Sequence, residues 1–234
     1  LEGCMDETAC NYNPEANIAD ESCEFPELVG YGCDGHLLIT QENIYQAVDA
    51  WLEDSVSTEA IYGHISDWDV SSVTNMESLF QDATSFNGDI SSWDVSNVTN
   101  IGGIFYYATS FNGDLSSWDV SSVTDMNNMF RNATSFNGDI SSWNVSNVTN
   151  MYAMFYEASS FNGELSSWDV SSVTDMSYMF WGATSFNGEL SSWVVSSVTN
   201  MNEMFNGAYE FNSDISGWDV SNAVSYTHLR AHET

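Results

Sequence analysis

The sequence predicts a repeat solenoid, with a parallel β-sheet on one face, short helical turns on the other and a capping helix before the first coil. Three observations support this fold class. A unit of 25 residues recurs, with full copies from residues 65, 90, 115, 140, 165 and 190 and a partial seventh from residue 215. A tryptophan marks the same place in every copy, from Trp68 to Trp218. Repetition at a fixed period of this size indicates units that stack on their neighbours.

The 234 residues divide into four segments. We expect a disulfide-bonded, Cys-rich module over residues 1–36, a helical cap over 37–64, the repeats over 65–222 and a non-repeat tail over 223–234. The composition of SYTHLRAHET at residues 225–234 differs from that of the repeats, and we expect this tail not to be native. We also expect a processed product or fragment, with further repeats beyond Asn222 in the natural protein.

The net charge is extreme, at -32, with 34 acidic residues, two arginines (Arg131 and Arg230) and no lysine. Phosphate binding needs a basic face, so this charge excludes nucleic acid and anionic lipid as partners. No apolar run of about 18 residues is present, and we expect no membrane insertion. The repeats carry no G-x-S-x-G or H-E-x-x-H motif, so we expect no enzymatic activity.

All four cysteines (Cys4, Cys10, Cys23 and Cys33) lie in the first segment. An even number in a short, loop-rich stretch predicts two disulfides, and three pairings remain open. A zinc site is the alternative, but no C-x2-C pair is present. Disulfides form in oxidising compartments, so we expect an extracellular protein, secreted or on the cell surface.

The stretch GCMDETACNYNPEANIADESC resembles a short cysteine module that is found beside repeats in secreted proteins. Four of its side chains offer oxygen ligands for Ca²⁺, which is the one cofactor that we consider: Asp6, Asn11, Asn13 and Asp20. The alternative is that these residues only form turns.

The segment before the repeats predicts an amphipathic helix over about residues 43–52, with Thr40 as its N-cap. Its apolar stripe consists of Ile44, Ala47, Val48, Trp51 and Leu52. We expect this helix to cover the hydrophobic cross-section of the first coil. A helix that binds a partner is the alternative.

Within one copy, Leu165, Trp168 and Val170 follow the spacing L-x-x-W-x-V, which is similar to the strand of leucine-rich repeats. A buried tryptophan needs an acceptor for its indole N–H group. The later pattern M-x-x-M-F-x-x-A, from Met176 to Ala183, predicts two helical turns. Asn or Asp precedes this pattern in all six full copies, as an N-cap requires.

Each copy then continues with Phe-Asn, and Asn187 and Gly188 predict a tight turn with positive φ. The asparagine is invariant among the full copies: Asn87, Asn112, Asn137, Asn162, Asn187 and Asn212. If these amides point inward, each can bond the backbone of the next coil and form a ladder. If they point outward, they only make turns; we expect the ladder.

The unit W-D-V-S-S-V-T-D-M-x-x-M-F-x-x-A-x-S-F-N-G-D resembles the repeat of BspA-like surface proteins, and residues 168–189 show it nearly letter for letter. The resemblance spans about residues 61–222. It implies a leucine-rich-repeat-like solenoid on a cell surface, with a role in adhesion or surface architecture and no catalytic residues. The sequence departs from the pattern at Asn144, Val194 and Asn212-Ser213.

The copies differ most on the predicted outer face. Parallel coils stack about 4.8 Å apart, so variable positions of successive copies form one ridge. Arg131 is expected between Tyr106 and Tyr156, in a cation–π arrangement. We expect an interaction surface here, with unrelated surface aromatics as the alternative. The predicted ridge consists of Tyr106, Tyr107, Arg131, Tyr152, Tyr156, Tyr178 and Trp181.

Sequons for N-glycosylation occur at Asn97, Asn132, Asn144 and Asn147, and short sequons also arise by chance. We prefer Asn132, which lies on the predicted ridge.

Acidic residues also recur in two columns, Asp89 to Asp214 and Asp69 to Asp219. Neighbouring carboxylates repel each other, so we expect stability to depend on cations such as Ca²⁺, whether at specific sites or through screening.

The sequence therefore predicts an extracellular structural or interaction protein, either a cell-surface adhesin or the subunit of an extracellular filament. Its expected partners are other protein chains, including copies of itself. A carbohydrate-binding surface module, with glycans as partners, is the alternative.

Overall fold

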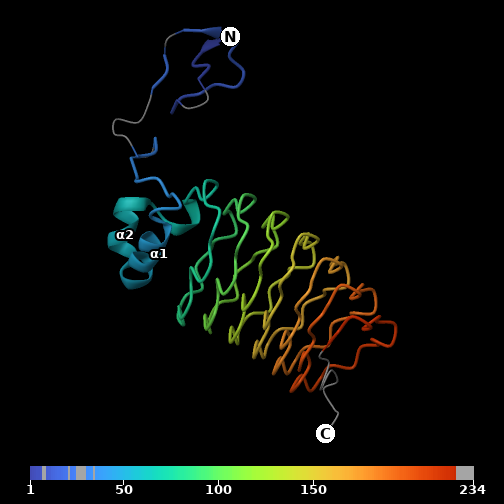
Figure 1. The fold of residues 1–234 in the computed structure, drawn as a ribbon. Coiled ribbons are helices and arrows are strands. Elements are labelled where there is room, and N and C mark those ends of the chain that lie inside the picture. Colours follow the sequence, from blue (N-terminus) through green and yellow to red (C-terminus); the bar gives the residue numbers. More distant parts are fainter. Residues whose placement is uncertain (7–8, 21, 25–29, 34, 225–234) are drawn as a thin grey trace.

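The protein is described by a computed structural model in which helices α1 (Ile44–Glu53) and α2 (Ser55–Tyr62) precede a stack of coils (Figure 1). A short 3-10 helix, η1 (Ile65–Asp67), leads into the first coil. The coils lie side by side along one axis, with α1 and α2 at one end and the N-terminal segment beyond them. The structure describes residues 1–6, 9–20, 22–24, 30–33 and 35–224.

The N-terminal segment holds a two-stranded parallel sheet of β1 (Glu2–Gly3) and β2 (Ile18–Ala19). Disulfides join Cys4 to Cys23 and Cys10 to Cys33. The two predicted disulfides are thus confirmed, and the structure chooses one of the three pairings. A segment this short buries too little apolar surface for a core of its own, and the cross-links take that role.

The helix predicted before the repeats corresponds to α1, whose residues Ile44, Ala47 and Val48 are buried. The predicted N-cap, Thr40, is wrong: the helix is capped at Asn43. Thr40 lies in the preceding turn, where its N–H group donates to Asn43 Oδ1 at 2.7 Å. The helix therefore begins one turn later than a Thr40 cap would set it.

The second helix, α2, was not expected from the sequence. Asp54 is its N-cap and accepts a hydrogen bond from the Ser57 N–H group at 3.2 Å. A carboxylate that satisfies a free N–H group in the first turn is a common start signal for a helix. The Asp-Ser-Val-Ser stretch thus carried a signal that the apolar pattern alone did not show.

The described repeats contain neither the strand nor the helical turns that we expected. Each pair of neighbouring coils shares one isolated parallel bridge in the Asn/Asp column, from Asn75 to Asn200. Those side chains cap turns rather than helices: Asp175 Oδ1, for example, accepts from the Ser177 N–H group at 2.8 Å. The leucine-rich-repeat-like class as such stays a prediction.

The stretch expected to be helical forms successive tight turns instead. The Leu79 N–H group donates to the Met76 carbonyl three residues back, at 3.2 Å. The Met76 N–H group donates to the Asn100 carbonyl of the next coil, at 2.9 Å. Ser78 and Asp82 adopt a φ of 59°, as the third residue of a type II turn requires. Alternate N–H groups thus link neighbouring coils, where a helix would have kept them within one coil.

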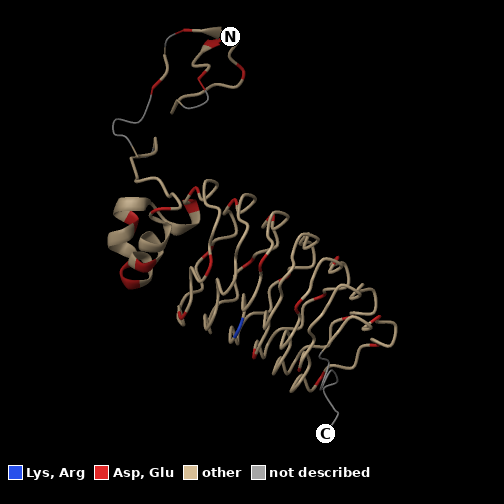
Figure 2. Ribbon diagram, viewed as in Figure 1, with Lys and Arg blue, Asp and Glu red and all other residues tan. Residues whose placement is uncertain are grey.

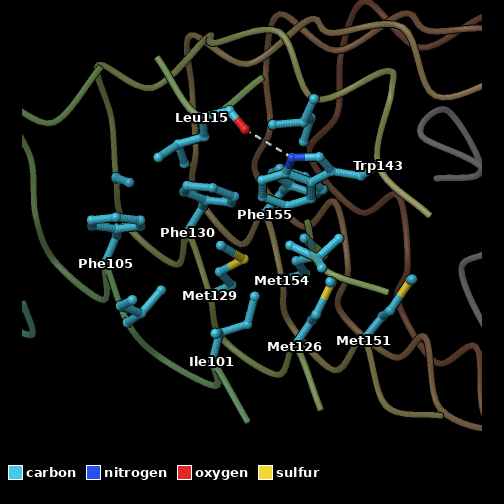
Figure 3. Close-up of a cluster of buried hydrophobic side chains, with 14 of the residues drawn as sticks. Ile101, Phe105, Leu115, Met126, Met129, Phe130, Trp143, Met151, Met154 and Phe155 are labelled. Atoms are coloured by element: carbon cyan, nitrogen blue, oxygen red, sulfur yellow. Dashed lines mark hydrogen bonds between the residues drawn. The ribbon is translucent and has the colours of Figure 1, made fainter. Parts of the chain in front are cut away.

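One hydrophobic core runs through the whole stack, from Ile39 to Trp218. Phenylalanine rings stack from coil to coil, as Phe130 and Phe155 do at 5.6 Å between centroids. The expected tryptophan acceptors lie in the preceding coil, and Trp143 Nε1 donates to the Leu115 carbonyl at 2.9 Å (Figure 3). The apolar columns are therefore core, and the indole N–H groups tie each coil to the one before it.

The predicted asparagine ladder is present. The Asn112 N–H group donates to Asn87 Oδ1 at 2.8 Å, and the same bond recurs as far as Asn212. However, these side chains are exposed, so the ladder lies on the surface and does not point inward.

The expected positive φ at Gly188 is wrong, because this glycine is not among those with a positive φ. A Cβ atom there would lie 2.9 Å from the Phe186 ring and 3.0 Å from the Gly163 carbonyl oxygen. The glycine is needed for space.

Candidate functional site

Four positions of each copy point away from the core and vary in sequence. In the first copy these are Glu77 and Ser78, which lie between the buried Met76 and Leu79, and Gln81 and Asp82, which lie between the buried Phe80 and Ala83. Because the turns of successive coils are hydrogen-bonded in register, the same four positions of every coil lie on one face. This face carries the predicted ridge.

Arg131 lies between two tyrosine rings on that face. Its guanidinium carbon is 4.3 Å from the centre of the Tyr156 ring and 5.6 Å from that of Tyr106. The expected cation–π arrangement is confirmed. Tyr156 in turn stacks on Trp181 of the next coil, with centroids 4.5 Å apart and planes 9° from parallel.

The other ridge residues extend this row. Tyr107 meets Tyr106 edge to face at 4.9 Å, and Tyr178 meets Tyr152 at 5.9 Å. All seven predicted residues therefore join one set of ring contacts that crosses four coils, and we call this set the aromatic ridge. Tyr107 is 40% exposed and the others are half-buried, so the ridge is accessible.

Two tyrosines of the ridge adopt a backbone conformation that favours glycine. The φ angles are 57° at Tyr107 and 60° at Tyr178. A left-handed conformation costs an ordinary residue about 1–2 kcal/mol. Glycine occupies the equivalent positions in other coils, as at Gly103 and Gly207. The large side chains are thus held on this face against a local backbone preference.

Arg131 is the sole lysine or arginine of the described residues, and Figure 2 shows how the acidic residues surround the coils and helices. Its guanidinium makes one hydrogen bond within the described chain, from Nη1 to Asn128 Oδ1 at 3.3 Å. The buried Nε has no partner among the described residues. Burial raises the pKa of the neighbouring Tyr156, and the Arg131 charge opposes this rise. Stacking, more than hydrogen bonding, holds this cation.

The acidic columns are built from a repeated turn. Asp114 Oδ1 accepts from both the N–H group and the hydroxyl of Ser116, at 2.9 and 2.7 Å. These hydrogen bonds lower the pKa of Asp114, and the charges of Asp89 and Asp139 in the adjacent coils oppose the shift. The carboxylates are therefore satisfied within their own coil, and they still repel each other along the column.

Three of the four proposed calcium ligands in the N-terminal segment, Asn11, Asn13 and Asp20, make hydrogen bonds within the segment. Asn13 Oδ1 accepts from the Glu15 N–H group at 3.0 Å, and Asp20 Oδ1 accepts from that of Ser22 at 3.0 Å. The Asn11 amide contacts the Ser22 carbonyl and the Glu24 N–H group. Within the described ranges, no group of three His, Cys, Asp or Glu residues could hold a metal ion. The contacts of Asn13 and Asp20 are those of turns, as in the alternative interpretation, and a calcium site stays a prediction.

Two stretches of the chain, residues 50–166 and 136–232, match the family model described as "Mycoplasma protein of unknown function, DUF285". Together they cover more than half of the chain. The chain belongs to this family. The match covers the repeats, in agreement with the BspA-like resemblance there, and begins after the cysteine segment. No curated protein and no solved structure matches the chain.

The sequons differ in accessibility. Asn97, Asn144 and Asn147 are exposed. Asn132, which we preferred, is only 7% exposed, and its Nδ2 donates to Glu157 Oε2 at 2.5 Å. A glycan on Nδ2 would have no room there, so the preference for Asn132 is wrong. The sequence did not reveal this, because Asn132 shares its column with exposed residues such as Asp82 and Tyr107.

Sequence reasoning missed Gln41, which closes the first coil. Its Oε1 accepts from the N–H groups of Thr74 and Asn75 at 3.0 and 2.9 Å, and its Nε2 donates to the Asn75 carbonyl. In later coils, the equivalent threonine N–H bonds the preceding coil, as Thr99 does to Thr74. One amide side chain thus replaces the backbone of an absent coil, a role that no apolar pattern reveals.

In the described part of the chain, no helix has the length and hydropathy needed to cross a membrane.

Proposed function

We propose that this chain is an extracellular repeat protein, built as a solenoid, and that its aromatic ridge is a contact surface for other protein chains. The continuous row of ring contacts from Tyr107 to Trp181 carries this proposal. Tyrosine, tryptophan and arginine are the residues most enriched at the centres of protein interfaces. The tryptophan and phenylalanine columns of the coils are buried, whereas the ridge side chains are accessible to a partner.

The two disulfides support the extracellular location, because such bonds persist in oxidising compartments. A cell-surface adhesin and a filament subunit are the two forms of the proposal. In a filament the ridge contacts a second copy of the chain. The net charge of -32 opposes such contact, so the filament form needs salt or divalent cations to screen the repulsion.

One polar cluster near the cap contains a histidine, a serine and an aspartate but lacks the arrangement of a catalytic triad. His64 Nδ1 lies 2.8 Å from Ser66 Oγ, and this hydroxyl donates to Asp67 Oδ1 at 3.0 Å. In a nucleophilic triad, the acid orients the histidine, and the histidine takes the proton of the hydroxyl. Here the acid binds the hydroxyl itself, and the His64 side chain caps η1.

The test is the mass of the native chain in solution, measured by light scattering at physiological salt with and without Ca²⁺. The filament form of the proposal predicts particles larger than one chain. Replacing Tyr156→Gln and Trp181→Asn, which are the residues at the same position in the first and last full copies, should reduce the particle mass. Tyr209→Ala, which removes an exposed aromatic side chain outside the ridge, is the control.

An unchanged mass in the double variant, with an unchanged melting temperature, would exclude the ridge as a contact between copies. A wild-type chain that is monomeric in every condition would exclude the filament form.

A further inference from the structure

One end of the aromatic ridge is hollow. A cavity of about 350 Å³ opens beside Tyr106, Arg131 and Tyr152, over the backbone of Gly102 and Gly103. This volume lies near the lower limit of small-molecule sites, which span about 300–1,000 Å³. Gly102 and Gly103 occupy the positions that Glu77 and Ser78 occupy in the first copy. No other full copy has glycine at both of these positions. The hollow therefore exists because two side chains are missing from one coil.

The glycines also let the neighbouring coil come close. A Cβ atom on Gly102 would lie 2.7 Å from Asn127 Nδ2, and one on Gly103 would lie 3.1 Å from Ser78 Oγ. Gly103 in addition has a φ of 61°. A side chain at either position would therefore fill the hollow or displace its wall.

The polar groups of the wall are fixed by a chain of hydrogen bonds. Asn127 Nδ2 donates to Asp125 Oδ1 at 2.8 Å, and Asn127 Oδ1 accepts from Asn128 Nδ2 at 2.6 Å. Asn128 Oδ1 in turn accepts from Arg131 Nη1. A wall whose side chains already hold one orientation loses little entropy when a ligand binds. Nε is buried, and the two Nη groups of the guanidinium keep most of their hydrogens for that ligand.

The chemistry of the lining favours a neutral ligand with many hydroxyl groups. Amides, a hydroxyl, a guanidinium and one carboxylate supply both donors and acceptors, and two tyrosines supply apolar surface. An anion would meet the Glu77 carboxylate within the hollow and the field of a chain with a net charge of -32. A purely apolar ligand would leave these polar groups unpaired, which is costly.

We propose that this hollow binds a neutral saccharide of one or two sugar rings, with Arg131 and the amides of Asn127 and Asn128 bonding its hydroxyl groups. The proposal rests on the proposed function, since it makes a glycan one of the contacts of the ridge. It assigns the site to one coil, so the remaining coils present the ridge without it.

Amide chemical shifts in a ¹H–¹⁵N spectrum of the full chain test the proposal. The probes are glucose, galactose, mannose, N-acetylglucosamine and their common disaccharides, each added alone. At least one should shift the Gly102 and Gly103 amides in a saturable way. Gly102→Tyr, which copies the residue at this position of the fourth copy, should weaken that binding by about tenfold or more. Arg131→Gln, which copies the first copy, should weaken it as well.

Asn202→Tyr is the matched control, because it places the same side chain at the same position four coils away, and it should leave the binding unchanged. No saturable shift with any sugar would overturn the proposal, as would binding that survives Gly102→Tyr. A response to acetate or glucuronate but to no neutral sugar would make the hollow an anion site and would also overturn it. The Tyr156 and Trp181 residues of the assembly test lie outside the lining, so the two proposals can fail separately.

Discussion

The N-terminal segment and the coils are stabilised in opposite ways. In the first, two covalent bonds join residues 19 and 23 positions apart, and Cys4 and Ala9 are the buried apolar residues among its described positions before the cap. In the second, no disulfide cross-links the coils, because all four cysteines precede them, and a continuous core is repeated every 25 residues. The comparison shows that stability is local in the segment but is shared between neighbours in the stack.

The largest expected effect is on the shared core. Phe155 is fully buried and stacks on Phe130, Phe161 and Phe180, at 5.6, 4.0 and 5.5 Å. Phe155→Ala should lower the free energy of unfolding by about 3–5 kcal/mol, because it leaves a cavity between three coils. Urea denaturation followed by far-UV circular dichroism measures this. Tyr209→Ala, which truncates a side chain that is 66% exposed, is the control and should change stability by less than about 0.5 kcal/mol.

A smaller effect, confined to one region, is expected from the disulfides. Replacing Cys4→Ser and Cys23→Ser opens a loop of 19 residues and should cost the N-terminal segment about 3 kcal/mol. All nine tryptophans lie at or after Trp51, so tryptophan fluorescence reports the cap and coils alone. Its unfolding midpoint should not move, whereas limited proteolysis should cut the segment faster. A shifted midpoint would show that the two regions are coupled.

Thiol titration of the unreduced wild-type chain should find no free cysteine.

The smallest effect is expected from the acidic columns. Hydrogen bonds from serine hold the pKa values of Asp114 and Asp119 below their ordinary range in the folded chain. A lowered folded pKa stabilises the fold above the unfolded pKa of about 3.9, and this stabilisation is lost as the pH falls through the folded value. The melting temperature should therefore decrease below about pH 4. A melting temperature that rose on acidification would mean that repulsion within the columns outweighs the hydrogen bonds.

The same repulsion makes stability depend on salt at neutral pH. Millimolar Ca²⁺ should raise the melting temperature by more than NaCl of equal ionic strength does, if carboxylates of adjacent coils share an ion. Equal shifts would mean screening alone.

The strict 25-residue period made much of this molecule predictable. Columns of Trp, Met and Phe identified the core, the stripe from Ile44 to Trp51 identified α1, and stacking in register placed Arg131 between its two tyrosines. These features depend on which residues recur, and the sequence states that directly. The hollow depends on the opposite, namely two side chains that one copy lacks, which a search for recurring residues passes over.

The backbone conformation of the coils was not predictable by the same route. The spacing from Met76 to Ala83 fits an amphipathic helix, and a series of four-residue β-turns buries the same residues. The distinguishing signal was available in the column of Asp82, Asn132, Gly182 and Gly207, which are residue types that tolerate positive φ. Tyr107 and Glu157 in that column obscured it. Hydrogen bonds between neighbouring coils favour the turns over a helix, and the sequence of a single repeat does not show these bonds.

The hydrogen bond from each tryptophan indole to the preceding coil also restricts which insertions and deletions preserve the fold during evolution. Trp143 donates to Leu115 and Trp168 to Ile140, so the same bond recurs with a shift of 25 residues. Loss or duplication of one whole copy re-creates every bond at the junction, whereas an insertion of any other length puts all later columns out of step. Slippage between near-identical stretches of the gene therefore yields folded proteins only in whole units. The reach of the molecule can change in steps of about 4.8 Å, the spacing of one coil, while each remaining surface keeps its chemistry.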